Sequence, residues 1–88
     1  MDCIYVLRSL RDNNRYIGST NDLTKRLSQH NNGLVQSTKN RLPLVLEYCQ
    51  EFESLIEARM MESKYKRSRG TYELAVKNGL LKKQRGVA

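Results

Sequence analysis

The chain has 88 residues, of which 39% are hydrophobic, so it can form one small domain whose core lies between about two layers of secondary structure. Sixteen Lys and Arg residues outweigh nine Asp and Glu residues, and no apolar run approaches the roughly 18 residues of a membrane-spanning helix. Glycine-rich phosphate loops, Cys/His metal spacings and internal repeats are absent from the sequence. We therefore expect a cytoplasmic, monomeric protein without membrane contact.

The positive charge is concentrated at the C-terminal end. Residues 1–63 contain eight basic and eight acidic residues, whereas residues 64–88 contain eight basic residues and one acidic residue, Glu73. A basic segment of this kind favours a polyanionic partner, most often nucleic acid. The alternative is a basic end that is only solvated.

The N-terminal part of the sequence predicts a β-hairpin. Residues 3–7 form an apolar run that is rich in β-branched and aromatic residues, turn-forming residues follow at 11–14, and residues 15–19 form a second strand. Strand alternation places Tyr5 with Cys3 and Leu7 on one face of the first strand, and Tyr16 with Gly18 on one face of its partner.

A helix and a third strand are predicted after the hairpin. Thr20 or Asn21 can cap a helix that runs to Asn31, where an Asn-Asn-Gly sequence indicates its end. Residues 34–43 form a polar loop, and residues 44–49 form a buried strand.

Two further helices are predicted in the C-terminal half. Ser54 and Glu57 form a capping box, which predicts a helix from there to Arg69, ended by Gly70. Thr71 is then expected to cap a short helix over residues 72–78.

The predicted fold class is α+β, with element order β-β-α-β-α-α. A three-stranded, mostly antiparallel sheet is flanked by three helices in a single domain over residues 1–79, and residues 80–88 form a basic, frayed tail. Cys3 and Cys49 lie within strand-like stretches and are interpreted as small buried hydrophobic residues rather than as a disulfide or a zinc site.

One carboxylate falls on the predicted buried face of the helix that follows Ser54. Four residues recur at helical spacing and form one stripe, namely Leu55, Ala58, Glu62 and Tyr65. Because burial of an unpaired charge is costly, Glu62 must be paired, bind a cation or lie at an open edge of the sheet. The alternative to a metal ligand is an ion pair with Arg59, Lys66 or Arg69.

Arg26 and His30 are four residues apart and share one face of the preceding helix. Taken alone, Arg26 is interpreted as a solvated arginine and His30 as a histidine at the rim of the domain near a helix end. Together with two strand tyrosines and Glu62, however, they can converge on one sheet edge. That combination is typical of a site that hydrolyses phosphodiester bonds.

These residues resemble the signature of the GIY-YIG nuclease superfamily. Cys3-Ile4-Tyr5 stands where the family has its first tripeptide, with cysteine in place of glycine, and Tyr16-Ile17-Gly18 stands where it has the second. The continuation through Arg26, His30 and the helix of Glu62 is similar to the Slx1-like and UPF0213-type branch, which points to a small stand-alone member. The N-terminal domain of the C component of excinuclease ABC is also similar.

The resemblance implies a metal-dependent endonuclease that hydrolyses DNA phosphodiester bonds in a structure-specific or repair-related reaction. Tyr5 would accept a proton from the attacking water, directly or through a relay, and Tyr16 would orient that water. Arg26 would bind the scissile phosphate, and His30 would assist proton transfer or contact the phosphate. Glu62 would be the single protein ligand of one Mg²⁺ or Mn²⁺ ion, which keeps much of its hydration. A metal and an arginine near a tyrosine would favour the phenolate.

Basic residues around these positions are expected to contact DNA, with RNA left open, and they are Lys25, Lys39, Arg41, Lys64, Lys66, Arg67 and Arg69. Two other functions are compatible with the sequence: a non-catalytic nucleic-acid-binding module, and a subunit that depends on a partner protein for its target. A pure binding module has no need of a carboxylate beside phosphate, which favours the enzyme. Some family members use an asparagine after the glutamate, but Asn78 beside Gly79 is interpreted as a helix end.

Overall fold

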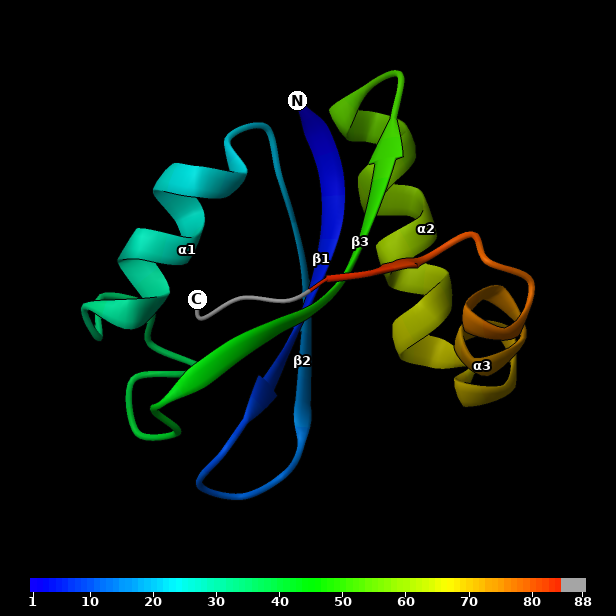
Figure 1. Cartoon of the computed structure of the whole chain (residues 1–88). Coiled ribbons are helices and arrows are strands. Elements are labelled where there is room, and N and C mark those ends of the chain that lie inside the picture. Colours follow the sequence, from blue (N-terminus) through cyan, green and yellow to red (C-terminus); the bar gives the residue numbers. More distant parts are fainter. Residues whose placement is uncertain (85–88) are drawn as a thin grey trace.

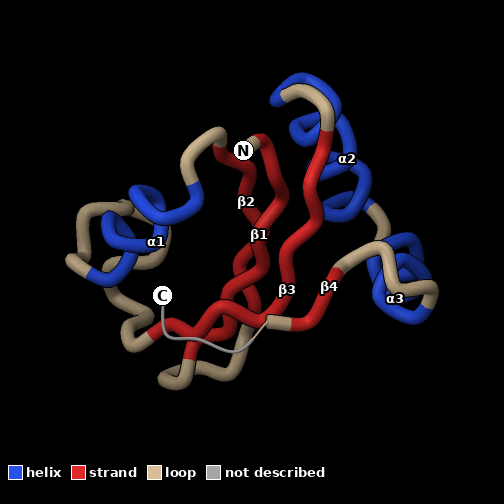
Figure 2. Tube along the Cα trace, turned by 45° about the horizontal axis from the view of Figure 1, so that its top comes forward, coloured by secondary structure: helices blue, strands red, loops and turns tan. Residues whose placement is uncertain are grey.

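An antiparallel sheet separates one helix from two others (Figure 1). The computed structural model describes residues 1–84. The strands are β1 (Asp2–Ser9), β2 (Arg15–Thr20), β3 (Leu44–Phe52) and β4 (Lys82–Lys83). They are arranged in the order β2-β1-β3-β4, so that β2 and β4 form the two edges (Figure 2). Helix α1 (Leu23–Asn31) lies on one side of the sheet, and α2 (Leu55–Arg67) and α3 (Arg69–Lys77) lie on the other.

Side-chain alternation along β1 divides the core into two parts. Tyr5 and Leu7 pack with Leu44 on the α1 side, where Tyr16 joins them. The opposite side of the sheet holds the larger cluster, which consists of Ile4, Val6, Ile17, Ala58, Tyr65, Tyr72, Ala75 and Leu81. The predicted hairpin is confirmed, and its register places both tyrosines on the same face of the sheet, because Tyr5 lies opposite Gly18 and Leu7 opposite Tyr16.

The start of α1 differs slightly from the prediction. Asp22, rather than Thr20 or Asn21, is the N-cap, and its carboxylate accepts a hydrogen bond from the Lys25 amide (3.1 Å). A carboxylate at this position satisfies a first-turn donor and also complements the helix dipole. The predicted cap of α2 is confirmed, because Ser54 Oγ accepts from the amide of Glu57 (3.2 Å).

The predicted boundary between α2 and α3 is wrong. Gly70 was expected to end the second helix, but it lies in the first turn of α3, and Ser68 is both the last cap of α2 and the first cap of α3. Ser68 has an extended backbone, and its hydroxyl accepts from the Thr71 amide (3.2 Å). A serine cap satisfies a helix donor directly, whereas one glycine costs a helix only about 1 kcal/mol. The predicted end of α3 is confirmed, with Asn78 as its C-cap.

The chain after α3 adds a strand that the sequence did not predict. Leu81 is buried with an exposed fraction of 2%, and the next two residues pair with Tyr48 and Cys49 of β3. The sheet therefore has four strands rather than three, because the buried leucine anchors the segment beside the free edge of β3. Residues 85–88 of the predicted tail lie outside the described residues. Within the described part of the chain no helix is long and apolar enough to cross a membrane.

Candidate active site

A buried chain of hydrogen bonds runs from β1 to the loop after α1. Tyr5 Oη lies 2.9 Å from His30 Nε2, and His30 Nδ1 lies 2.7 Å from Thr38 Oγ1. Arg26 Nε donates to Tyr5 Oη (3.2 Å). Because the phenol oxygen already accepts from arginine, we assign its own proton to the bond with His30 Nε2. His30 Nδ1–H then donates to Thr38.

Burial determines the protonation of this chain. Loss of hydration lowers the pKa of His30 to about 4, and the charge of Arg26 acts in the same direction. Burial raises the pKa of Tyr5 to about 12. Arg26 favours the phenolate as expected, but its effect is smaller than that of burial. At neutral pH the Tyr5 side chain is therefore a phenol, and the His30 side chain is a neutral imidazole.

Gly18 allows Tyr5 to lie against β2. A Cβ atom at Gly18 would lie 2.5 Å from Tyr5 Oη and 2.6 Å from its Cζ, distances that real Cβ contacts essentially never show. Gly18, the last residue of the second tripeptide, thus has a packing role. Any side chain at this position would push the Tyr5 phenol away from Arg26 and His30.

Four of the five predicted catalytic residues come together on the α1 side of the β2 edge. The ring centroid of Tyr16 lies 6.2 Å from that of Tyr5 and 5.1 Å from that of His30. Tyr16 is half-buried, whereas Tyr5 has an exposed fraction of 1%. The interpretation of His30 as a rim histidine is wrong, because its exposed fraction is 0%.

The fifth residue, Glu62, reaches the same edge from α2. Its Oε1 accepts from Ser19 Oγ (2.5 Å), and its Oε2 pairs with Lys66 Nζ (2.6 Å). The carboxylate side chain is 18% exposed, so the predicted position on the packed stripe of the helix is confirmed. Of the ion pairs that the sequence left open, the one with Lys66 is formed. In residues 1–84 no hydrogen bond or ion pair joins Glu62 directly to Arg26, whose side chain contacts Tyr5 and Gln29 instead.

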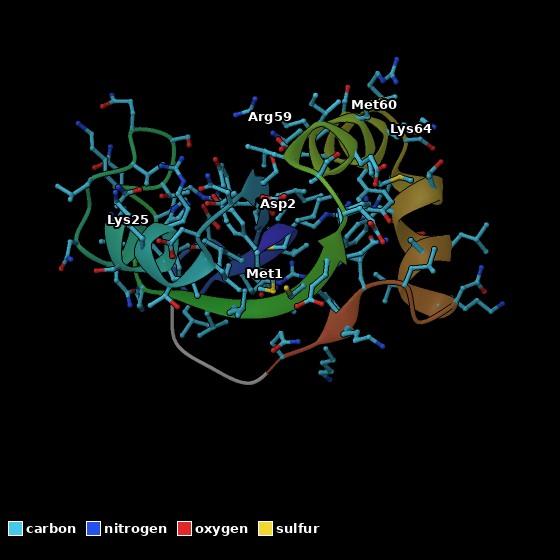
Figure 3. All side chains as sticks on the ribbon, turned by 90° about the horizontal axis from the view of Figure 1, so that it is seen from above. Met1, Asp2, Lys25, Arg59, Met60 and Lys64 are labelled. Carbon is cyan, nitrogen blue, oxygen red and sulfur yellow. The ribbon has the colours of Figure 1, made fainter. Side chains whose placement is uncertain are left out.

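Two basic concavities flank Glu62. The Arg26 concavity, about 410 Å³, lies where α1 and α2 begin, and its lining includes Ser19, Lys25, Arg26, Gln29 and Arg59. Figure 3 shows Arg59 extending from α2 towards the α1 side of the molecule, with Met60 and Lys64 on the other side of α2.

The Arg15 concavity, about 370 Å³, lies beside the start of β2 and is lined by Arg15, Tyr16, Ile17, Tyr65, Lys66 and Arg69. Ser19 lines one concavity and Lys66 the other, and both bind Glu62. The carboxylate is therefore placed between the two basic surfaces. A further concavity, about 530 Å³, is elsewhere, between Cys49 of β3 and Leu80.

The predicted DNA-contacting residues fall into separate groups. Lys25, Lys66 and Arg69 line the two concavities. Lys64 and Arg67 are exposed on α2, and Lys39 is exposed on the loop before β3, and these three line neither concavity.

Arg41 has a structural contact as well. Its Nε donates to Asp12 (2.8 Å) and its second terminal nitrogen to the carbonyl of Asn14 (3.0 Å), so it joins the loop before β3 to the hairpin turn. The guanidinium lowers the pKa of Asp12 to about 2.

Several residues of the site were not assigned from the sequence. Thr38 lies in a polar loop without periodicity, and nothing local connects it to His30. Gln29, which accepts from an Arg26 terminal nitrogen (3.1 Å), gave no signal either. Arg59 precedes Glu62 by three residues and so shares its helix face, which was a usable signal.

The fold and this site define the class of protein. Residues 1–76 match the family described as the GIY-YIG catalytic domain. The chain therefore belongs to the GIY-YIG family of nuclease domains, whose substrate is nucleic acid.

Its curated relatives are small UPF0213 proteins. It is 43% identical to UPF0213 protein spr1390 of Streptococcus pneumoniae over 67 residues, which cover 75% of this chain and 67% of the relative. It is 40% identical to UPF0213 protein CPE1444 of Clostridium perfringens over 63 residues, with 70% and 67% covered. With UPF0213 protein YazA of Bacillus subtilis the identity is 39% over 64 residues, with 72% and 64% covered. No solved structure matches.

Proposed function

We propose that the protein is a metal-dependent endonuclease that hydrolyses phosphodiester bonds in DNA. The residues that would carry the reaction are Tyr5, Tyr16, Arg26, His30 and Glu62. The observation that supports this most is the hydrogen-bonded set of Arg26, Tyr5 and His30, in which a phosphate-binding cation touches a phenol beside a neutral base.

The proton route follows from the assigned hydrogen bonds. Tyr5 is protonated at neutral pH, so it can accept a proton from water only while it passes its own proton to His30 Nε2. The water oxygen bonds to phosphorus, the bond from phosphorus to the leaving oxygen breaks, and that oxygen takes a proton from solvent. His30 ends as an imidazolium whose Nδ1–H is held by Thr38.

Arg26 couples phosphate binding to this route. Its Nε covers the Tyr5 hydroxyl, and Gln29 holds one terminal nitrogen. A phosphate at the Arg26 concavity would draw the guanidinium outward and open the hydroxyl to the attacking water. Half-buried Tyr16, whose ring lies beside both Tyr5 and His30, would orient that water.

Glu62 is the residue that would hold the divalent ion. Among residues 1–84 no group of three or more His, Cys, Asp and Glu side chains is placed to hold a metal ion. A single carboxylate suits Mg²⁺, which keeps several waters and also binds substrate phosphate. When bound, the ion supplies Lewis-acid stabilisation of the phosphate charge. Lys66 must leave Oε2 for this to happen, and its side chain is 50% exposed and can move into solvent.

The pair of Lys66 with Glu62 also supports a second candidate, a non-catalytic nucleic-acid-binding module. A carboxylate that is neutralised by lysine needs no metal, and the basic concavities would still bind phosphate. The proposal also includes that the protein acts in the cytoplasm, as a monomer, on structured or damaged DNA. A partner protein would supply the target specificity.

Cleavage of duplex, flap and junction DNA distinguishes these functions. We expect cleavage by the purified chain with Mg²⁺ or Mn²⁺, and its loss with a chelator or in Glu62→Gln. DNA binding without cleavage under any metal would contradict the enzyme and support the binding module. Cleavage that survives in Glu62→Gln would contradict the metal role of Glu62.

A further inference from the structure

The Arg15 concavity is built from cations that three elements bring together. Arg15 comes from β2, Lys66 from α2 and Arg69 from α3. Its wall also contains Tyr16, one of the proposed catalytic residues, and the Lys66 ammonium lies 5.9 Å from the Tyr16 ring centroid. The concavity is therefore continuous with the proposed site.

Arg15 is held in place by an aromatic stack. Its guanidinium carbon lies 4.3 Å from the ring centroid of Tyr72, which is 4% exposed. Tyr72 in turn packs edge-to-face against Tyr65, with centroids 5.8 Å apart. A guanidinium that lies over an aromatic ring can still offer N–H groups to an oxyanion such as phosphate. Among residues 1–84, no side chain or backbone group forms a hydrogen bond or ion pair with the Arg15 guanidinium.

The other two cations have partners that an anion can displace. Arg69 pairs with Glu73 (3.1 Å), but both side chains are more than half exposed, at 78% and 61%, and ion pairs exposed to this degree contribute little to stability. Lys66 pairs with Glu62, the carboxylate that would bind the metal. Metal binding at Glu62 would thus release a cation towards the Arg15 concavity.

We propose that the Arg15 concavity binds a second phosphate of the nucleic-acid strand whose scissile phosphate lies at Arg26. The strand runs along the outer edge of β2, where no further strand of the sheet intervenes. Thr20, at the other end of β2, lines the Arg26 concavity, and the span from Arg15 to Thr20 is about 16 Å at about 3.3 Å per residue. A B-form strand rises about 3.4 Å along the helix axis per phosphate. The substrate is therefore a strand of several nucleotides. This inference rests on the proposed function.

The test compares Arg15→Met with Arg11→Met. Methionine keeps an apolar chain against Tyr72 and removes the charge, and Arg11, exposed in the hairpin turn, lines neither concavity. Binding of a fluorescent DNA duplex is followed by anisotropy at several salt concentrations without divalent metal. Arg15→Met should weaken binding and reduce the slope of log K against log salt by about 0.9, which is the value for one phosphate contact.

The control and the second variant make the outcome decisive. Arg11→Met should keep the wild-type slope, and Arg15→Lys, which restores the charge, should recover it. Melting temperatures show which variants remain folded. If Arg15→Met has lost its fold, the DNA affinity and salt slope of Arg15→Ala are compared with those of Arg15→Lys instead. An unchanged slope in a folded, charge-free Arg15 variant would overturn the inference. If the wild type binds but never cleaves, the proposed function fails while the phosphate subsite stands.

Discussion

Replacement of Gly18 by alanine tests whether the contact between β2 and Tyr5 positions the site. The added Cβ would lie 2.5 Å from Oη, 2.6 Å from Cζ and 3.0 Å from Cε1 of Tyr5. The phenol cannot turn aside freely, because it is 1% exposed and bonded to His30 and Arg26. The ring must therefore move, and the buried hydrogen-bond chain must move with it.

The size of the effect follows from the distances. An ordinary contact needs 3.4 Å or more, so Oη must withdraw by about 1 Å, which breaks at least one of its bonds of 2.9 Å and 3.2 Å. Overpacking costs about 1–3 kcal/mol and the lost hydrogen bond about 1 kcal/mol. The total of about 2–4 kcal/mol should lower the melting temperature of Gly18→Ala by roughly 10–30 °C, since about 1 kcal/mol shifts a domain of this size by about 4–8 °C. A displacement of about 1 Å at the site should reduce cleavage by about 10²-fold.

Thermal unfolding followed by circular dichroism, together with single-turnover cleavage, measures both effects. Gly70→Ala is the matched control, because its added Cβ would meet only Ser68 Oγ, at 4.0 Å, inside helix α3. That variant should melt at or slightly above the wild-type temperature, because alanine is favoured over glycine by up to about 1 kcal/mol in a helix and Gly70 lies in its first turn. A Gly18→Ala protein that melts and cleaves like the wild type would refute the packing role of Gly18.

Four further predictions concern the site. Tyr5→Phe should lower single-turnover cleavage by about 10²–10⁴-fold at nearly unchanged DNA affinity, and a near wild-type rate would exclude Tyr5 as the proton acceptor. Glu62→Gln should abolish Mg²⁺-dependent cleavage without lowering the melting temperature, because it removes a desolvated charge. A lower melting temperature with intact cleavage would show that Glu62 serves only as half of a structural ion pair. Lys66→Met should tighten Mn²⁺ binding measured by electron paramagnetic resonance, because Oε2 loses its competing ammonium, and equal affinity would argue against a metal at Glu62. The pKa of His30 is about 4 in the folded state against 6.5 in the unfolded chain, so the unfolded state binds more protons between these values. The contribution of neutral His30 to the free energy of unfolding should therefore be fully present above about pH 6.5. It should decrease as the pH approaches 4, by up to about 3 kcal/mol, and denaturant titrations of His30→Gln should lack this part of the pH dependence.

Local signals in the sequence determined the strand and helix order and much of the site's composition. Strand alternation assigned Tyr5 and Tyr16 each to a face of its own strand, and helical spacing placed Glu62 on the packed stripe of α2, because both patterns depend on neighbours within a few residues. The two tripeptides, followed by Arg26 and His30, identified the family.

Long-range contacts decided the rest. Thr38 buries and orients His30 from a loop that carries no periodic signal, and the position of β2 gives Glu62 its Ser19 contact. The burial of Leu81 and the pairing of the strand after it both require the open edge of β3. The residues near Leu81 in the sequence give no indication of this edge. Burial, which only the packed structure defines, also outweighs the charge of Arg26 and keeps the Tyr5 phenol protonated. The sequence alone therefore identifies which side chains gather at this edge, whereas their protonation and partners depend on segments that are distant in the chain and adjacent only in the fold.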